Sequence, residues 1–185
     1  MSIAVIYGGT RANGNTELLT ERAIEGLTVD RIHLKEYTIR PIEDMRHDEK
    51  GFTELDDDYT AVLDRMLEHD ILLFATPIYW YSMSGQMKNF IDRWSQTLRD
   101  KKRPHFRESM KTKTGYVIAV GGDEPNLKGL ALVQQFQHIF GFMGTRYGGY
   151  VLGEGNRPGD ILNDQVALHA ADQLRSKLLQ HGEKL

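Results

Sequence analysis

The stretch that decides the fold is the apolar run Ile3-Ala4-Val5-Ile6-Tyr7, followed at once by Gly8-Gly9-Thr10-Arg11-Ala12-Asn13-Gly14-Asn15-Thr16. An amphipathic helical pattern follows over residues 16–27. A strand that turns through a glycine-rich loop into a helix presents backbone N–H groups at the helix N-terminus, where the helix dipole also favours an anion. The sequence therefore predicts a phosphate-binding loop. The alternative is an ordinary strand-to-helix turn with Asn15 or Thr16 as the helix N-cap.

The composition of this loop narrows the kind of phosphate. Gly9 to Thr16 has the spacing of the nucleotide-triphosphate loop G-x-x-x-x-G-K-[ST], but Asn15 stands in the place of the required lysine. An ATPase or GTPase is therefore not expected, and the dinucleotide fingerprint G-x-G-x-x-G is also absent. The remaining hydroxyl, amide and guanidinium groups suit a single phosphate monoester. They belong to Thr10, Arg11, Asn13, Asn15 and Thr16.

Bulk composition excludes several classes of protein. The 185 residues fit a single domain over 1–185, and a net charge of -3 gives no sign of a nucleic-acid partner. Without cysteine there is no disulfide, no thiolate nucleophile and no cysteine-ligated cluster. Charged residues interrupt every long apolar segment, so we expect a cytoplasmic protein without membrane association. No metal site is expected, because the seven histidines lack ligand spacing and Asp56 to Asp58 suit a helix N-terminus.

Strand-length apolar runs alternate with helical patterns along the chain. The strands are expected at residues 3–7, 29–34, 71–75, 116–120 and 146–152. The helices are expected at residues 16–27, 57–69, 85–98, 127–143 and 164–181. Such alternation implies right-handed crossovers and a sheet covered on both faces. We therefore predict an α/β fold, a three-layer α/β/α sandwich around a five-stranded parallel sheet.

Two further loops have unusual composition at expected strand ends, where sheets of this kind bind ligands. Residues 76–85 place Tyr79, Trp80 and Tyr81 next to Pro77. Stacking faces and loop N–H groups suit a planar ring such as a flavin, although these aromatic residues could instead pack against helices or a second subunit. Gly121 and Gly122 could approach the ring edge through their backbone, or could begin a plain turn with Asn126 as N-cap.

These segments resemble the flavodoxin-like NADPH-dependent FMN reductase family. Gly8 to Thr16 is similar to its phosphate loop G-S-x-R-x-x-G-N-T, with Gly9 in the serine place. Residues 75–79 and 85–94, Ala-Thr-Pro-Ile-Tyr and Gly-Gln-Met-Lys-Asn-Phe-Ile-Asp-Arg-Trp, resemble its S-P-x-Y…G-x-x-K-x-F-x-D-R signature. The family includes quinone reductases related to the tryptophan-repressor-binding protein and the iron–sulfur flavoproteins. The resemblance covers nearly the whole chain and implies the strand order 2-1-3-4-5.

The resemblance also implies a cofactor and its contacts. Arg11, Asn13, Asn15 and Thr16 would hold the FMN phosphate, and Pro77, Ile78, Tyr79 and Trp80 would line the ring. Gly9 removes one hydroxyl ligand, which predicts weaker FMN binding, and residues 41–51 lack the cysteines of the iron–sulfur relatives. Hydride would pass from NADPH or NADH through FMN N5 to a quinone, a nitro compound or free flavin, with no catalytic side chain.

Several alternatives stay open. A flavodoxin-type electron carrier would be more acidic than this chain, and Gly9 is the one hint of a non-catalytic flavin-binding regulatory protein. The basic stretch Lys101 to Lys113 could meet the 2′-phosphate of NADPH, although a solvated excursion is favoured. The family's sites are completed by a neighbouring subunit, so a homodimer or homotetramer is expected.

Overall fold

The computed structural model describes residues 2–49 and 51–182 and contains one five-stranded sheet. The strands are β1 (Ile3–Tyr7), β2 (Asp30–His33), β3 (Ile71–Pro77), β4 (Thr114–Gly121) and β5 (Arg146–Glu154). All neighbouring pairs are parallel, in the order β2-β1-β3-β4-β5. The predicted flavodoxin-like sheet is therefore confirmed, and the carboxyl ends of β1, β3 and β4 lie next to one another.

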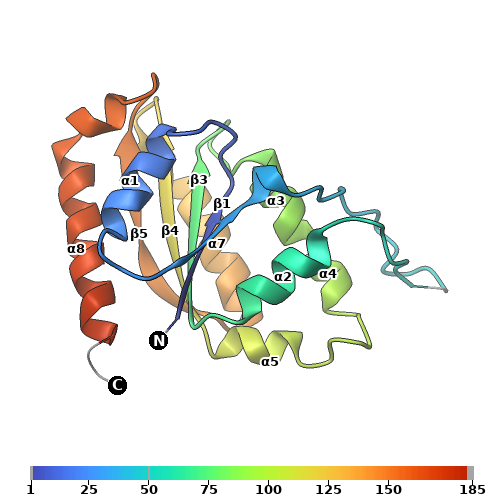
Figure 1. Ribbon diagram of the computed structural model, residues 1–185. Helices are drawn as coiled ribbons and strands as arrows, with labels where there is room; N and C mark the ends of the chain where they lie inside the picture. Colours follow the sequence, from blue (N-terminus) through green and yellow to red (C-terminus); the bar gives the residue numbers. More distant parts are fainter. Residues whose placement is uncertain (1, 50, 183–185) are drawn as a thin grey trace.

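Helices cover both faces of the sheet (Figure 1). α1 (Asn15–Ala23) and α8 (Gln165–Gly182) pack on one face together with the 3-10 turn η2 (Asp160–Asn163). The other face is covered by α2 (Tyr59–Leu67), α3 (Gly85–Asp92), α4 (Trp94–Thr97), α5 (Phe106–Lys111) and α7 (Leu130–Met143). Two short elements complete the chain, η1 (Leu34–Glu36) and α6 (Pro125–Lys128).

Alternation along the strands builds the two cores. In β1, Ala4 and Ile6 face the α2–α3–α7 side, whereas Ile3, Val5 and Tyr7 face α1 and α8. All five side chains are buried, as expected for a parallel sheet with helices on both sides. Among the described residues no helix is both long and apolar enough to cross a membrane.

Two expected helices are each divided in the structure. The helix expected over 85–98 is divided at Arg93, and the one expected over 127–143 is divided at Gly129. A Cβ at Gly129 would lie 2.4 Å from the Pro125 carbonyl oxygen and 2.9 Å from Ile78 Cδ1, so only glycine fits this close approach. The alternative of an N-cap at Asn15 or Thr16, and that of one at Asn126, are not what the structure shows: Gly14 precedes α1, and α6 begins with Pro125 after Glu124.

The basic stretch forms part of the fold at the edge of the sheet opposite the β1–α1 loop (Figure 1). It contains α5, which buries Phe106 and Met110. The Lys113 ammonium is buried and donates to the carbonyl oxygens of Leu67 and His69 at 2.6 and 2.7 Å. Burial lowers the pKa of Lys113. A solvated excursion is therefore an incomplete description of this segment.

Candidate functional site

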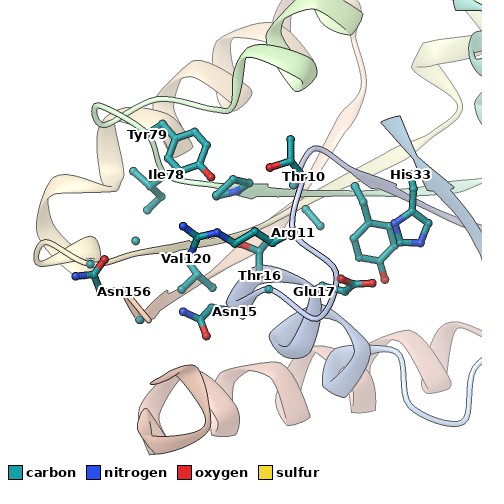
Figure 2. A pocket seen from close by; sticks show the side chains of 18 residues that line it. Thr10, Arg11, Asn15, Thr16, Glu17, His33, Ile78, Tyr79, Val120 and Asn156 are labelled. Carbon is teal, nitrogen blue, oxygen red and sulfur yellow. The ribbon is translucent and has the colours of Figure 1, made fainter. Parts of the chain in front are cut away.

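A cavity opens at the carboxyl edge of the sheet, where the loops after β1, β3, β4 and β5 meet (Figure 2). The residues that line it are Tyr7, Gly9, Thr10, Arg11, Gly14, Asn15, Thr16, Glu17, His33, Ala75, Pro77, Ile78, Tyr79, Val120, Gly121, Gly122, Gly155 and Asn156. Both sequence motifs therefore contribute to one cavity. Asn13 and Trp80, which the sequence analysis also selected, do not line it.

The β1–α1 loop carries a row of unpaired backbone donors. In the described part of the chain, the N–H groups of residues 9–12 and 14–17 have no protein acceptor within hydrogen-bond distance. Asn13 N–H is satisfied differently, by Glu17 Oε2 at 2.7 Å. Gly9 and residues 14–17 are buried or half-buried, where backbone donors normally find partners, and the first turn of a helix favours negative charge. This loop is therefore suited to an anion.

Arg11 adds a full positive charge to these donors. Its side chain is exposed and extends from the β1–α1 loop across the cavity toward Ile78 and Asn156 (Figure 2). Within residues 2–49 and 51–182, no carboxylate forms an ion pair with Arg11. Most other arginines of the chain do form one, so the Arg11 guanidinium is free to bind a ligand.

The Asn15 side chain, expected among the phosphate ligands, forms hydrogen bonds within the protein. Its side-chain amide donates to the Arg157 carbonyl oxygen at 2.8 Å and accepts from Gly159 N–H at 2.9 Å. The side chain therefore binds the loop after β5, and its backbone N–H is the donor left on the cavity side. A Cβ at Gly155 would lie 2.7 Å from Asn15 Nδ2, which explains glycine at that position.

The two neighbouring glycines of the loop have different surroundings. Gly8 N–H donates to the Ala75 carbonyl oxygen at 2.8 Å, and the Gly8 carbonyl accepts from Ser84 Oγ at 2.7 Å. A Cβ at Gly8 would lie 2.8 Å from Ser84 Oγ, so this residue joins the first loop to the start of α3. A Cβ at Gly9 would meet only Pro77 Cδ, at an ordinary 3.8 Å. The missing hydroxyl at Gly9 is therefore not imposed by a lack of space.

The β3–α3 loop forms a tight two-residue hairpin. Tyr79 and Ser82 exchange both backbone hydrogen bonds at 3.0 Å, and the Ile78 N–H donates to the Val120 carbonyl oxygen at 2.8 Å. The N–H groups of Ile78 and Tyr79 are therefore used within the protein. We expected loop N–H groups to meet a flavin edge, and between β3 and α3 of the described chain the unpaired ones are those of Trp80, Tyr81 and Met83.

The β4–α6 loop approaches this hairpin through the backbone of two glycines. A Cβ at Gly121 would lie 3.0 Å from Ile78 Cβ, and one at Gly122 would lie 3.0 Å from Asn156 Cβ. Glycine thus lets this strand end approach both neighbours. The Gly122 N–H has no acceptor among the described residues, which leaves a donor at this wall.

Backbone strain gathers around the cavity. Four residues other than glycine have positive φ in the described chain: Asn13 (53°), Trp80 (49°), Tyr81 (62°) and Glu124 (44°). All lie in the loops that follow β1, β3 and β4. Such conformations are costly for residues with a side chain and persist mainly where function requires them. This signal is independent of the sequence motifs and marks the same edge of the sheet.

Sequence reasoning missed the end of the cavity beside β2. Tyr7 and His33 stack with ring centroids 4.5 Å apart, and both line the cavity with Glu17. Tyr7 donates to Glu21 Oε1 at 2.5 Å; burial and this carboxylate raise the pKa of Tyr7. Arg31 holds the pKa of Glu21 below its usual range. The sequence pattern marks Tyr7 only as a strand residue, and no motif points to His33 or to Asn156.

Comparison with known proteins gives a consistent result. The family model for NADPH-dependent FMN reductase matches residues 1–155. A Bacillus subtilis protein, provisionally named NAD(P)H-dependent FMN-containing oxidoreductase YwqN, is 59% identical over 174 residues, 94% of this chain and 96% of the relative. The solved Trp repressor binding protein from Bacillus subtilis is 53% identical with a TM-score of 0.80, covering 94% of this chain and 97% of that chain.

A more distant relative marks where the chemistry differs. The iron–sulfur flavoprotein MJ1083 of Methanocaldococcus jannaschii is 29% identical over 196 residues, 97% of this chain and 96% of the relative. This chain has no cysteine, so it has no thiolates with which to ligate a cluster. Since the family model spans most of the chain, the protein belongs to the NADPH-dependent FMN reductase family and is an FMN-dependent NAD(P)H oxidoreductase.

Proposed function

We propose that the cavity is the FMN site and that the β1–α1 loop binds the phosphate. The unpaired N–H groups of residues 9–12 and 14–17 carry this assignment, since a phosphate monoester accepts several hydrogen bonds at once. Arg11 supplies the counter-charge, and the hydroxyls of Thr10 and Thr16 lie on the same cavity wall. Asn15 would contribute its backbone N–H, because its amide already holds residues 157–161.

The ring lies, in this proposal, between the β3–α3 and β4–α6 loops. Pro77, Ile78 and Tyr79 form one wall, and the backbone of Gly121 and Gly122 forms the other. The Tyr79 ring is 49% exposed and its hydroxyl points into the cavity (Figure 2). An apolar wall opposite a glycine backbone fits a flat heterocycle with one polar edge.

When bound, FMN supplies the redox chemistry, accepting a hydride from NAD(P)H and passing two electrons to an acceptor. The residues of this chain bind and orient it. Gly122 N–H, which has no acceptor among the described residues, would donate to the polar edge of the ring and would stabilise negative charge there. No side chain is assigned as a general acid or base.

The acceptor is proposed to be a small flat molecule, namely a quinone, a nitro compound or free flavin. Half-exposed Tyr79 lines the cavity, the almost fully exposed Trp80 lines a hollow that adjoins it, and both offer faces for stacking. Exposed aromatic residues at one rim are also suited to burial by another subunit, so we propose a homodimer or homotetramer. Size-exclusion chromatography with light scattering tests the oligomeric state.

A direct experiment tests the function. The purified chain is titrated with FMN while flavin fluorescence is followed, and NADPH oxidation is then measured with a quinone as acceptor. We expect saturable FMN binding and acceptor-dependent turnover. Absence of FMN binding at micromolar concentrations contradicts the proposed site, whereas binding without NADPH oxidation favours a carrier or regulatory role.

The electron-carrier alternative has weaker support. Carriers dock on basic partners through acidic surfaces, whereas this chain has a net charge of only -3 and an unpaired arginine at the cavity. Reduction by NADPH alone, at rates that match steady-state turnover, separates an enzyme from a carrier that needs a partner reductase.

A further inference from the structure

The tip of the β3–α3 hairpin is strained and exposed at the same time. Trp80 and Tyr81 occupy the two central positions of the turn with φ of 49° and 62°. Turns of this shape normally use Asn-Gly or Gly-Gly, because side chains disfavour positive φ. Trp80 is 94% exposed, so packing of its ring does not hold the turn in place. Something else must stabilise this conformation.

A chain of side-chain interactions ties the tip to the facing loop. The Tyr81 hydroxyl donates to Asp123 Oδ2 at 2.8 Å, and Lys128 Nζ donates to Asp123 Oδ1 at 2.6 Å. Lys128 also pairs with Glu124 at 2.9 Å. Lys128 and the Tyr81 hydroxyl hold the pKa of Asp123 below its usual range, so it remains an acceptor. Asp123 directly follows Gly121 and Gly122, which form the other wall of the cavity.

The same residues enclose a shallow hollow beside the main cavity. Its lining is Ile78, Trp80, Tyr81, Gly121, Gly122, Asp123 and Pro125. Ile78, Gly121 and Gly122 also line the main cavity, so the two spaces adjoin. The Tyr81–Asp123 hydrogen bond therefore spans the two loops between which the ring is proposed to lie.

We propose that Tyr81 and Asp123 are positioning residues: their hydrogen bond latches the strained turn to the β4–α6 loop and so sets how closely the ring site is enclosed. This inference rests on the proposed function. Without the bond, the turn is free to relax toward negative φ and to move Tyr79 and Trp80 away from Gly121. The phosphate loop lies on β1 and keeps its donors, so the loss falls on the ring and not on the phosphate.

The test compares two flavins, FMN and riboflavin, which lacks the phosphate. Tyr81→Phe removes the hydroxyl and keeps the ring, and Asp123→Ala removes the acceptor. We expect each change to raise the Kd of both flavins by the same factor, about threefold to tenfold for one hydrogen bond. The double variant should be no weaker than Asp123→Ala alone, because Asp123→Ala already removes the Tyr81 hydrogen bond together with the one from Lys128. Asp123→Asn retains an acceptor oxygen and should recover part of the affinity.

Tyr150→Phe is the matched control. Tyr150 is 46% exposed, as against 45% for Tyr81, and lies on β5 outside the cavity lining. It should leave both Kd values unchanged. The proposal is overturned if Tyr81→Phe behaves like this control, if the two single changes add, or if FMN is weakened and riboflavin is not.

A second measurement needs no flavin and separates failure of the latch from failure of the proposed function. Trp94 is buried among Phe74, Phe90 and Phe106, so fast depolarisation of tryptophan fluorescence reports Trp80. If the wild-type chain binds no flavin, the proposed function fails and this signal decides the latch. A larger fast component in Tyr81→Phe supports it, and an unchanged decay overturns it.

Discussion

Two arginines of this chain have opposite surroundings. Arg93, at the break between α3 and α4, is 2% exposed, donates to Asp57 at 2.5 Å and to Gln96 at 2.7 Å, and lies over the Tyr59 ring. Arg11, on the cavity, is exposed and has no ion pair among the described residues. The Arg93 charge is paired within the protein, whereas the Arg11 charge is available to a ligand. Both arginines stand in motif segments, and the motif alone does not tell the paired arginine from the unpaired one.

The same contrast holds for the backbone. Around Arg93, even the Arg40 carbonyl accepts a hydrogen bond from the guanidinium, at 3.1 Å. Around Arg11, a run of N–H groups stays unpaired and Asn13 has positive φ. A protein satisfies its buried polar groups and avoids strained residues where it can. The unpaired and strained edge is therefore the part of the chain shaped for a ligand.

Breaking the buried pair should have the largest effect. Arg93→Ala leaves the Asp57 carboxylate buried without its counter-charge, and we expect a loss of about 3–5 kcal/mol in the free energy of unfolding. Urea denaturation measures it. Lys88→Ala is the control, because the Lys88–Asp92 pair has the same 2.5 Å separation but is exposed, and its loss should be below about 0.5 kcal/mol. Equal losses for the two variants would contradict this assignment.

Removing the free charge should act on binding and not on folding. Arg11→Ala deletes a charge-assisted hydrogen bond, so FMN affinity should fall by about tenfold to 100-fold, while riboflavin affinity and urea stability stay unchanged. Flavin fluorescence titration gives the Kd values. Arg146→Ala is the control, since Arg146 is exposed at the opposite end of the sheet. A similar weakening of riboflavin would place Arg11 on the ring instead.

A pH series sharpens the contrast further. Burial alone would raise the pKa of Asp57, but Arg93 and the N–H groups of Arg40 and Tyr59 outweigh it and hold the pKa below the ordinary 3.8. The unfolded chain binds this proton first as pH falls, so the contribution is complete above 3.8 and is lost below it. The stability difference between wild type and Asp57→Asn should therefore be constant near neutral pH and shrink below 3.8. A difference that already shrinks at neutral pH would point to another group.

The sequence predicted what depends on local pattern. The apolar run of β1 and the alternation with helices were enough to predict a five-stranded parallel sheet, and the family resemblance supplied the strand order. Gly9 to Thr16 and Pro77 to Tyr79 do meet at one cavity. What it could not predict depends on residues far apart in the chain. The hydrogen bonds of the Asn15 amide to Arg157 and Gly159, more than 140 positions away, are one example.

Arg93 and Asp57 show the same limit in the core. As part of the signature, Arg93 could be interpreted as structural or interfacial, and Asp57 as part of an acidic run at a helix start. The structure brings them together across 36 positions and buries both. Arg93 lies at the break between α3 and α4, and helical periodicity carries no trace of this break.

The smallest expected effect concerns Gly9, which stands where the family's phosphate loop has a serine hydroxyl. Gly9→Ser introduces a Cβ whose nearest neighbour is Pro77 Cδ at 3.8 Å, an ordinary contact. The added hydroxyl can donate to the phosphate, so FMN affinity should rise by about twofold to tenfold, the range of one hydrogen bond. Riboflavin affinity should not change. Fluorescence titration of both flavins measures this, and equal gains for both would show that the serine acts on the ring.

Gly8→Ser is the matched control for Gly9→Ser, because it makes the same chemical change one residue earlier, where there is no space for a side chain. There the new Cβ would lie 2.8 Å from Ser84 Oγ and 3.0 Å from Met87 Cβ. The contact between the first loop and the start of α3 must then open, so both stability and FMN affinity should fall. If Gly8→Ser and Gly9→Ser instead behave alike, the packing at Gly8 does not hold the phosphate loop in place, and its unpaired N–H groups must be organised by the ligand itself.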